Sequence, residues 1–235
     1  EDVRREICLT LEDMGVTPQS SHHSGGPGQN IIEFCHSSAV HAADDVITYK
    51  SVVKTMAAHN GLTASFDPIP IPGKDGNGFH ITLTPMLREK DCSENFLAGI
   101  LAHAAEITAI LNPTADSYRR LGVFGAPEFV SWSEKSRRCF AYKKAGQPAI
   151  EVRSPDSTTN PYLAYAALIY AGLDGYLKRT KLPKPDAARE TSEKLPKSAE
   201  EALQVFEKSS FIRNVFPEYF VRTFIQTFGC PRSGV

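Results

Sequence analysis

The chain has 235 residues, of which 41% are hydrophobic and 23% are charged, and its formal net charge at pH 7 is -1. This is the composition of an ordinary globular protein with enough apolar side chains for a sizeable core. The near-neutral charge excludes a global basic field of the kind that holds nucleic acid, so we expect no nucleic-acid partner.

Cysteine usage and hydropathy indicate the compartment. The cysteines are odd in number, widely spaced and without a CxxC pair, which indicates reduced thiols in a cytoplasmic protein; they are Cys8, Cys35, Cys92, Cys139 and Cys230. No apolar run reaches the roughly 20 residues that span a bilayer, so we expect no membrane partner. The chain begins at Glu1, within a predicted helix, and we expect further sequence before it.

The chain opens with helices that enclose a loop and a strand. Apolar residues at helical spacing predict helices over residues 1–14 and 39–59, the first of them ended by Gly15. Residues 21–28 are rich in Gly, His and Pro and predict a loop. The β-prone residues 30–36 that follow predict a strand.

The middle of the chain contains two candidate strands and a long helix. Residues 63–66 and 79–84 predict strands, and the Gly-rich tip between them, residues 73–78, predicts a turn that presents backbone amides. Ser93 and a strong apolar stripe predict one helix over residues 93–111.

The remaining third changes from strands to helices. Residues 128–132, 139–142 and 149–153 predict strands, and the chain beyond Pro161 is expected to be helical. Ser198 and Glu201 form a capping-box pattern that predicts another helix start. The order of elements indicates the α+β class, with a helical C-terminal tail.

Two polar pairs stand out when the residues are considered singly. His22 and His23 beside glycines are compatible with a metal site or with a structural pair at a turn. Glu151 and Arg153 alternate along a predicted strand, so both side chains enter one space. That pair is compatible with a functional site or with an ion-paired sheet face.

Considered together, separated segments resemble the glutamine synthetase family, in the family's order. They are residues 22–30, 50–70 with 75–80, 112–122, 149–175 and 195–212. The resemblance implies that residues 1–235 form the family's catalytic domain, a curved antiparallel sheet, or partial barrel, backed by long helices. It also implies that the family's amino-terminal domain is absent from this sequence.

The family joins glutamate to ammonia with ATP through an acyl phosphate. The resemblance therefore implies an ATP-dependent carboxylate-amine ligase with small-molecule substrates, which uses ATP and Mg²⁺ or Mn²⁺. Hard cations of this kind prefer carboxylate ligands and neutralise phosphate charge. The family also forms rings, so we expect a homo-oligomeric ring.

The resemblance assigns roles to residues that match the family's motifs. The substrate-binding positions are Gly76, His80, Arg120 and Arg153. His80 and Glu151 are metal ligands, completed by a carboxylate from an upstream segment. Arg137 binds phosphate, and Arg137 and Arg153 are the catalytic arginines.

Several positions depart from the family pattern. Ser24 and Ile31 stand where two metal-ligand glutamates are expected, Asp75 replaces an asparagine, and Tyr142 replaces a second phosphate-binding arginine. The glutamate that shields the acyl phosphate falls near Gly125. A hydroxyl and an alkyl group cannot replace two anionic ligands, so this chain is a divergent member.

These departures leave alternatives of different classes. In the first alternative, the chain belongs to a ligase with altered metal use and poor glutamate-ammonia activity. In such a ligase, either Glu33 substitutes for a lost metal ligand or the second cation site is lost. Alternatively, the chain belongs to an inactive homologue with a regulatory, nucleotide-binding or structural role.

Overall fold

The computed structural model describes residues 2–87, 90–185 and 193–229. The helices are α1 (Asp2–Asp13), α2 (Ala39–His59), α3 (Ser93–Ala102), α4 (Ala104–Leu111), α5 (Ala115–Arg120), α6 (Pro161–Leu177), α7 (Ala199–Lys208), α8 (Ser210–Val215) and α9 (Glu218–Gly229). The strands are β1 (Pro18–His23), β2 (Asn30–Phe34), β3 (Ile81–Leu83), β4 (Met86–Leu87), β5 (Lys90–Asp91), β6 (Trp132–Ser133), β7 (Ala141–Tyr142) and β8 (Ile150–Val152).

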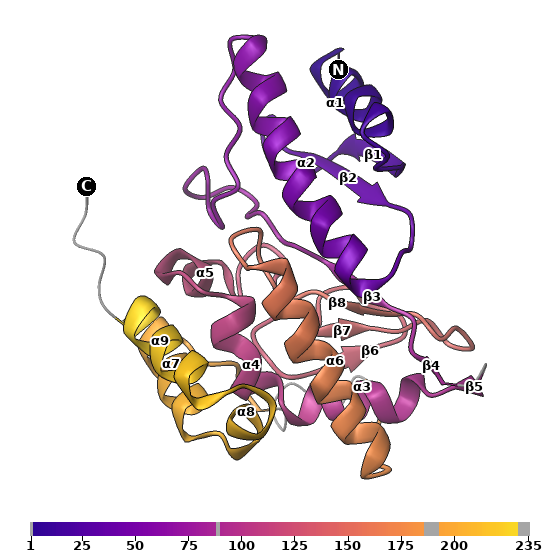
Figure 1. Ribbon diagram of the computed structural model, residues 1–235, viewed down its shortest axis with the longest axis vertical. Coiled ribbons are helices and arrows are strands. Elements are labelled where there is room, and N and C mark those ends of the chain that lie inside the picture. Colours follow the sequence, from indigo (N-terminus) through magenta and orange to yellow (C-terminus); the bar gives the residue numbers. More distant parts are fainter. Residues whose placement is uncertain (1, 88–89, 186–192, 230–235) are drawn as a thin grey trace.

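A small unit at one end of the molecule consists of α1, α2 and the antiparallel hairpin β1–β2 (Figure 1). The predicted helices of this unit are confirmed, and Gly15 ends the first with a φ of +85°. Their apolar stripes meet in a separate core whose buried residues are Ile7, Leu11, Val16 and Val52.

The prediction of a loop over residues 21–28 is wrong at its first residues, because Ser21–His23 belong to β1. β1 is entirely polar apart from Pro18, so it lacks the apolar alternation that predicts a strand. It forms because β2 supplies the buried face, with Ile32 and Phe34 packed against the core of the small unit.

No strand forms at residues 63–66, where the sequence predicts one. The backbone carbonyls of this segment accept side-chain hydrogen bonds in place of a ladder. Asn77 Nδ2 donates to the carbonyls of Ser65 (3.3 Å) and Asp67 (2.9 Å), and Ser157 Oγ donates to that of Phe66 (2.5 Å).

The main sheet has four short strands in the order β3-β8-β7-β6. β8 is antiparallel to both of its neighbours, whereas β6 and β7 are parallel. The sheet is open and does not close into a barrel within the described residues, and the mostly antiparallel α+β arrangement is confirmed. Its inward residues Ile81, Ile150 and Val152 share the main core with α3, α4 and α6.

The prediction of one helix over residues 93–111 is wrong, because α3 and α4 meet at His103 with an angle of 79°. The His103 ring lies between Glu106 and Asp174, and it stacks on Phe211 with the ring centroids 3.8 Å apart. These partners come from three helices, so the bend is set by tertiary contacts.

α3 and α6 cross at a pair of glycines. A Cβ on Gly99 would lie 2.2 Å from the carbonyl oxygen of Ala171, and a Cβ on Gly175 would lie 2.5 Å from the Cα of Gly99. The two backbones therefore touch directly, and α6 is held close behind the sheet.

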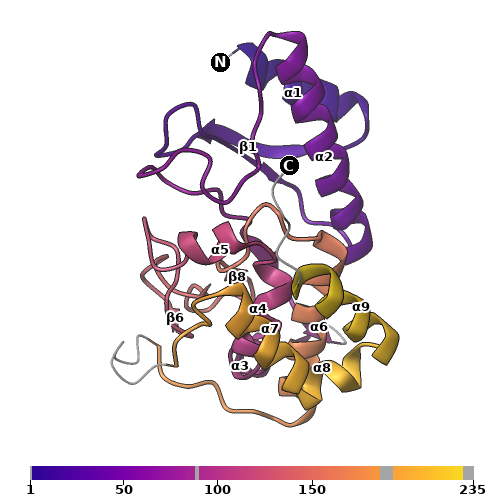
Figure 2. The same cartoon turned by 90° about the vertical axis from the view of Figure 1, so that its left-hand side faces the viewer.

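The helical tail is confirmed: α7, α8 and α9 gather beside α4 (Figure 2). Ser198 Oγ accepts the Glu201 amide at 3.1 Å, as the capping pattern predicts, while Glu201 Oε2 accepts the amide of Lys197. Cysteines 8, 35 and 92 are free thiols, Cys139 is buried, and Cys230 lies outside the described residues.

Within the described ranges, no single helix is long and apolar enough to span a membrane; α3 and α4 meet those criteria only as a bent pair.

Candidate active site

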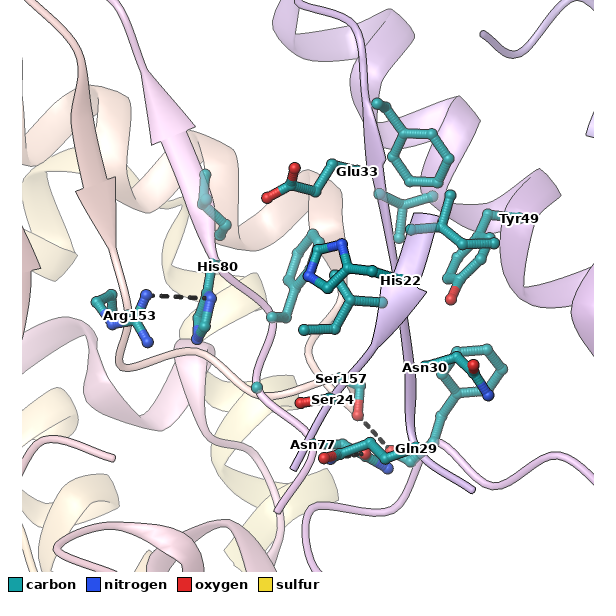
Figure 3. A pocket seen from close by; sticks show the side chains of 18 of the residues that line it. His22, Ser24, Gln29, Asn30, Glu33, Tyr49, Asn77, His80, Arg153 and Ser157 are labelled. Atoms are coloured by element: carbon teal, nitrogen blue, oxygen red, sulfur yellow. Dashed lines mark hydrogen bonds between the residues drawn. The ribbon is translucent and has the colours of Figure 1, made fainter. Parts of the chain in front are cut away.

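A cleft of about 2260 Å³ separates the β1–β2 hairpin from the main sheet. Figure 3 shows His80 and Arg153 on the sheet side, and the side chains of His22 and Glu33 directed from the hairpin toward that side. The six residues to which the sequence assigns roles all line this cleft; they are Gly76, His80, Arg120, Arg137, Glu151 and Arg153.

The sheet wall brings together His80, Glu151 and Arg153. His80 directly precedes β3, which pairs with β8. Glu151 lies in β8 and Arg153 directly follows it, and their alternation places both on one face. Glu151 Oε1 lies 3.6 Å from His80 Nδ1 and pairs with Arg153 Nη1. Arg153 Nη1 is 3.3 Å from His80 Nδ1. The predicted shared space of Glu151 and Arg153 is confirmed.

Arg137 reaches the same carboxylate from the loop between β6 and β7. Its Nε lies 3.3 Å from Glu151 Oε2, and its guanidinium lies 5.1 Å from the ring centroid of Tyr142. With 66% of the side chain exposed, Arg137 faces the open part of the cleft. Tyr142, the residue at the expected second arginine position, therefore supports Arg137 by a cation–π contact.

The surroundings of His80 keep its imidazole neutral. Desolvation inside the cleft, followed by the positive charges of Arg153, Arg120 and Arg137, lowers the pKa of His80, although 39% of its side chain is exposed. Both effects disfavour the charged form. A neutral imidazole is the form that ligates metals, so His80 is available as a nitrogen donor near neutral pH.

Arg120 is a buried arginine at the end of α5. Thr114 begins this helix with a capping box shared with Ser117. Arg120 is 5% exposed, and its Nη2 donates to Asn112 Oδ1 (3.3 Å) and to the carbonyl of Ser154. Its Nε has no hydrogen-bond partner in the described structure.

The Gly-rich loop packs on these groups so closely that side chains would not fit. A Cβ on Gly76 would lie 2.5 Å from the carbonyl oxygen of Pro68 and 2.8 Å from Arg120 Cγ. A Cβ on Gly78 would lie 2.9 Å from His80 Nε2. The glycines therefore bring a bare backbone edge to Arg120 and His80.

The hairpin wall differs from the sheet wall in its chemistry. Ile31 and Glu33 share a strand face, as predicted, and Ile31 lies opposite His22. Glu33 Oε2 accepts a hydrogen bond from Ser20 Oγ at 2.5 Å. Glu33 is the one carboxylate that β1 and β2 contain, so this wall offers a cation little negative charge.

The donor set fits part of a divalent-cation site. His80 and Glu151 are adjacent, but the described residues hold no cluster of three or more His, Cys, Asp or Glu side chains able to bind a metal ion. The site is better suited to the anions that accompany a cation, because it contains arginines. Within the described residues, Arg120 Nε and Arg153 Nε are buried without hydrogen-bond partners. Arg120, Arg137 and Arg153 all line the cleft, so its positive charge fits anionic ligands.

The loop that should contain the shielding glutamate is a tight turn. Phe124 and Gly125 have φ values of +48° and +87°, and the Ala126 amide donates to the carbonyl of Val123 at 3.0 Å. The loop lines the cleft with backbone and apolar side chains. No acidic side chain lies within residues 122–126.

Sequence reasoning missed one polar contact across the cleft. Gln29 on the hairpin loop donates to Asn77 Oδ1 and to the Gly76 carbonyl. Both amides lie in segments that resemble family motifs, but amide residues in two distant loops give no signal that they meet.

The chain is similar to known proteins over nearly its whole length. The family described as glutamine synthetase, catalytic domain, matches residues 1–228. A glutamine synthetase of Methanocaldococcus jannaschii is 39% identical over 202 residues, covering 78% of this chain and 44% of that protein. A glutamine synthetase of Thermotoga maritima is 34% identical over 254 residues, covering 96% of this chain and 58% of that protein.

Solved structures of a protein named GmaS, in an ADP complex and without ligand, superpose with a TM-score of 0.87 at 27% identity. The superposition covers 97% of this chain and 59% or 58% of those chains. The chain thus spans about half the length of the relatives it matches. With the sequence match running through nearly every described element, the chain belongs to the glutamine synthetase catalytic-domain family.

Proposed function

We propose that the full-length protein is an ATP-dependent carboxylate-amine ligase that acts poorly on glutamate and ammonia. The observation that carries this proposal is the set of cationic side chains, Arg120, Arg137 and Arg153, that line the cleft with His80 and Glu151. Planar guanidinium groups suit carboxylates, and family membership supports the reaction class.

Each of these residues has a role that its position supports. Arg120 and Arg153 orient the acid, and Arg137, exposed at the cleft opening, neutralises the transferred phosphoryl group. A carboxylate oxygen of the acid attacks the γ-phosphorus as ADP leaves. The amine nitrogen then attacks the acyl carbon, phosphate leaves, and the amine loses a proton.

His80 and Glu151 would hold a Mg²⁺ or Mn²⁺ ion together with a ligand from elsewhere in the protein. When bound, such a cation supplies charge neutralisation for the phosphates of ATP. Glu151 contributes the negative charge and His80 the neutral nitrogen, while Arg153 and Arg137 hold the carboxylate in place.

The poor activity on glutamate and ammonia rests on the hairpin wall and on Asp75. Ser24 and Ile31 supply no anionic ligand, and Glu33 is engaged by Ser20. Asp75 Oδ2 lies against Gly25 of the hairpin loop, where an added Cβ would be 2.2 Å away, so its negative charge lies between that loop and the Gly-rich loop. These same observations favour the second candidate, an inactive homologue that retains nucleotide binding.

One pair of measurements separates the two candidates. Calorimetric titration of the full-length protein with ATP and Mg²⁺ tests nucleotide binding, and phosphate release with a panel of acids and amines tests ligation. Binding with acid- and amine-dependent release supports the ligase. Binding without release for any pair supports the inactive homologue, and no binding contradicts both.

Further expectations for the whole protein derive from the family. We propose a homo-oligomeric ring in the cytoplasm, with residues 1–235 as the catalytic domain beside an amino-terminal domain. The relatives' greater length supports a further domain. Sedimentation of the full-length protein as a monomer would contradict the ring.

A further inference from the structure

Gln29 connects the hairpin to the Gly-rich loop through both ends of its amide. Its Oε1 accepts the Gly26 amide at 3.0 Å, which fixes the orientation of the group. Its Nε2 then faces the loop, donating to the Gly76 carbonyl at 3.1 Å and to Asn77 Oδ1 at 2.9 Å. Figure 3 shows Gln29 and Asn77 side by side at the base of the pocket.

Asn77 connects Gln29 to the segment that contains Asp67 and Pro68. Its Nδ2 donates to the carbonyl of Asp67 at 2.9 Å, and its backbone amide donates to the carbonyl of Pro68 at 2.9 Å. Gln29 and Asn77 therefore form one hydrogen-bonded chain from the hairpin to residues 65–68. Residues 75–77 belong to no helix or strand, so their position depends on such contacts.

The loop held in this way packs directly on substrate-side groups. Gly76 contacts the Arg120 side chain so closely that an added Cβ would lie 2.8 Å from Cγ. Gly78 is equally close to the His80 ring, at 2.9 Å from a built Cβ to Nε2. A shift of residues 75–78 would thus displace the buried guanidinium of Arg120 or open space beside it.

We propose that Gln29 is a positioning residue for the acid substrate, acting through Gly76 and Asn77 on Arg120. The inference rests on the proposed function, because it assumes that Arg120 binds the acid. Gln29 itself touches no reacting group. Its effect should be larger on the acid side of the cleft, because the Gln29 amide donates directly to Gly76, which packs on Arg120, and makes no described hydrogen bond to His80.

The test is Gln29→Glu in the full-length protein. This variant keeps the side-chain volume and the acceptor for Gly26, but it places an oxygen against the Gly76 carbonyl and Asn77 Oδ1. Losing two donated hydrogen bonds is worth about 1–2 kcal/mol, so we expect KM for the acid to rise about 5- to 30-fold. KM for ATP should rise less than KM for the acid, because the bonds that Gln29 donates end at Gly76 and Asn77 and none reaches His80.

The matched control is Asn30→Asp, the same amide-to-acid change on the next residue. Asn30 is exposed and donates to the Gly28 carbonyl within the hairpin, at 2.9 Å. It makes no described hydrogen bond to residues 75–78, so both KM values should stay near those of the wild type. Equal effects of the two variants, or a parallel rise of both KM values in Gln29→Glu, would overturn the proposal.

Hydrogen exchange gives a readout that needs no catalysis. The Asn77 amide is protected by its bond to the Pro68 carbonyl, and its exchange should accelerate about 5- to 30-fold in Gln29→Glu. If the wild-type protein shows no ligase activity, the proposed function fails, and this exchange experiment still tests the contact. Wild-type protection of Asn77 in the variant would show that Gln29 does not hold the loop.

Discussion

Replacing His103 with alanine should destabilise the packing of α3, α4, α6 and α8 in a pH-dependent way. The ring contacts Glu106 Oε2 through Nδ1 and Asp174 Oδ2 through Nε2, the latter at 2.8 Å, and 13% of its side chain is exposed. Lys178 also contacts Asp174 Oδ2, at 2.8 Å, and the Ser209 hydroxyl donates to Glu106. One imidazolium therefore bridges two carboxylates.

The magnitude follows from the contacts that alanine would remove. Each hydrogen bond to a charged partner contributes about 1.5–3 kcal/mol. Truncating one partner of a partly buried charged cluster costs about 3–5 kcal/mol, because the remaining charges lose their compensation. We expect a loss of about 3–5 kcal/mol below neutral pH, with Glu106 and Asp174 left facing each other.

The pH dependence follows from the directions of the pKa shifts. Burial lowers the pKa of His103, but its hydrogen bonds to Glu106 and Asp174 outweigh burial and raise the pKa above 6.5. This stabilisation is complete below the unfolded pKa of 6.5 and is lost as pH rises through the folded pKa. Burial raises the pKa of both carboxylates, but contacts with His103, together with Ser209 on Glu106 and Lys178 on Asp174, outweigh it and lower each pKa, so their contribution is lost on acidification.

Urea unfolding of the full-length protein between pH 5 and pH 9 measures the effect. The cost of His103→Ala should be largest near pH 5–6 and should fall by about 1.5–3 kcal/mol at pH 9, because a neutral ring donates from one nitrogen only. His41→Ala is the control, since His41 is 62% exposed and lies 3.8 Å from Asp45. A cost that is constant across this pH range would refute the reasoning.

Other perturbations have equally definite outcomes. Gly99→Ala should lower the free energy of unfolding by about 3 kcal/mol or more, because its Cβ would clash with an α6 carbonyl 2.2 Å away. In thermal unfolding, Gly146→Ala should cost only about 1–2 kcal/mol, since its φ of +70° is strained but its surroundings are open. Ser24→Glu combined with Ile31→Glu should raise metal-dependent phosphate release about 10²-fold, and an unchanged rate would contradict the account of the hairpin wall. Arg120→Lys should raise KM for the acid, without raising KM for ATP, because an ammonium group cannot form a forked contact with a carboxylate.

The sequence predicts best those elements whose signal is local. The apolar stripes at residues 2–13 and 39–59 each bury one helix face, and both helices form. The bend at His103 has no local signal, because the stripe continues through it and the ring's partner Asp174 is 71 residues away. β1 likewise has no local signal in the sequence, because its polar residues form a strand only through pairing with β2.

The candidate site shows the same division. Motif positions such as Glu151 and Arg153 could be placed in one space from strand alternation alone, and the structure confirms it. The contact between Gln29 and Asn77 could not be predicted, because 48 residues separate the two amides and no charge marks either one. The unpaired Nε of Arg120 is also invisible in sequence, since it depends on burial and on the absence of a nearby acceptor.

The two cores on either side of the cleft have a consequence for local unfolding. The small unit rests on a few buried residues of α1 and α2, whereas the sheet shares the far larger core of the molecule. Units with few buried contacts open at a lower free energy than the whole protein. The hairpin should therefore exchange its amide protons before the sheet does. A ligand that contacts both walls would slow that exchange and make the two units unfold as one cooperative body.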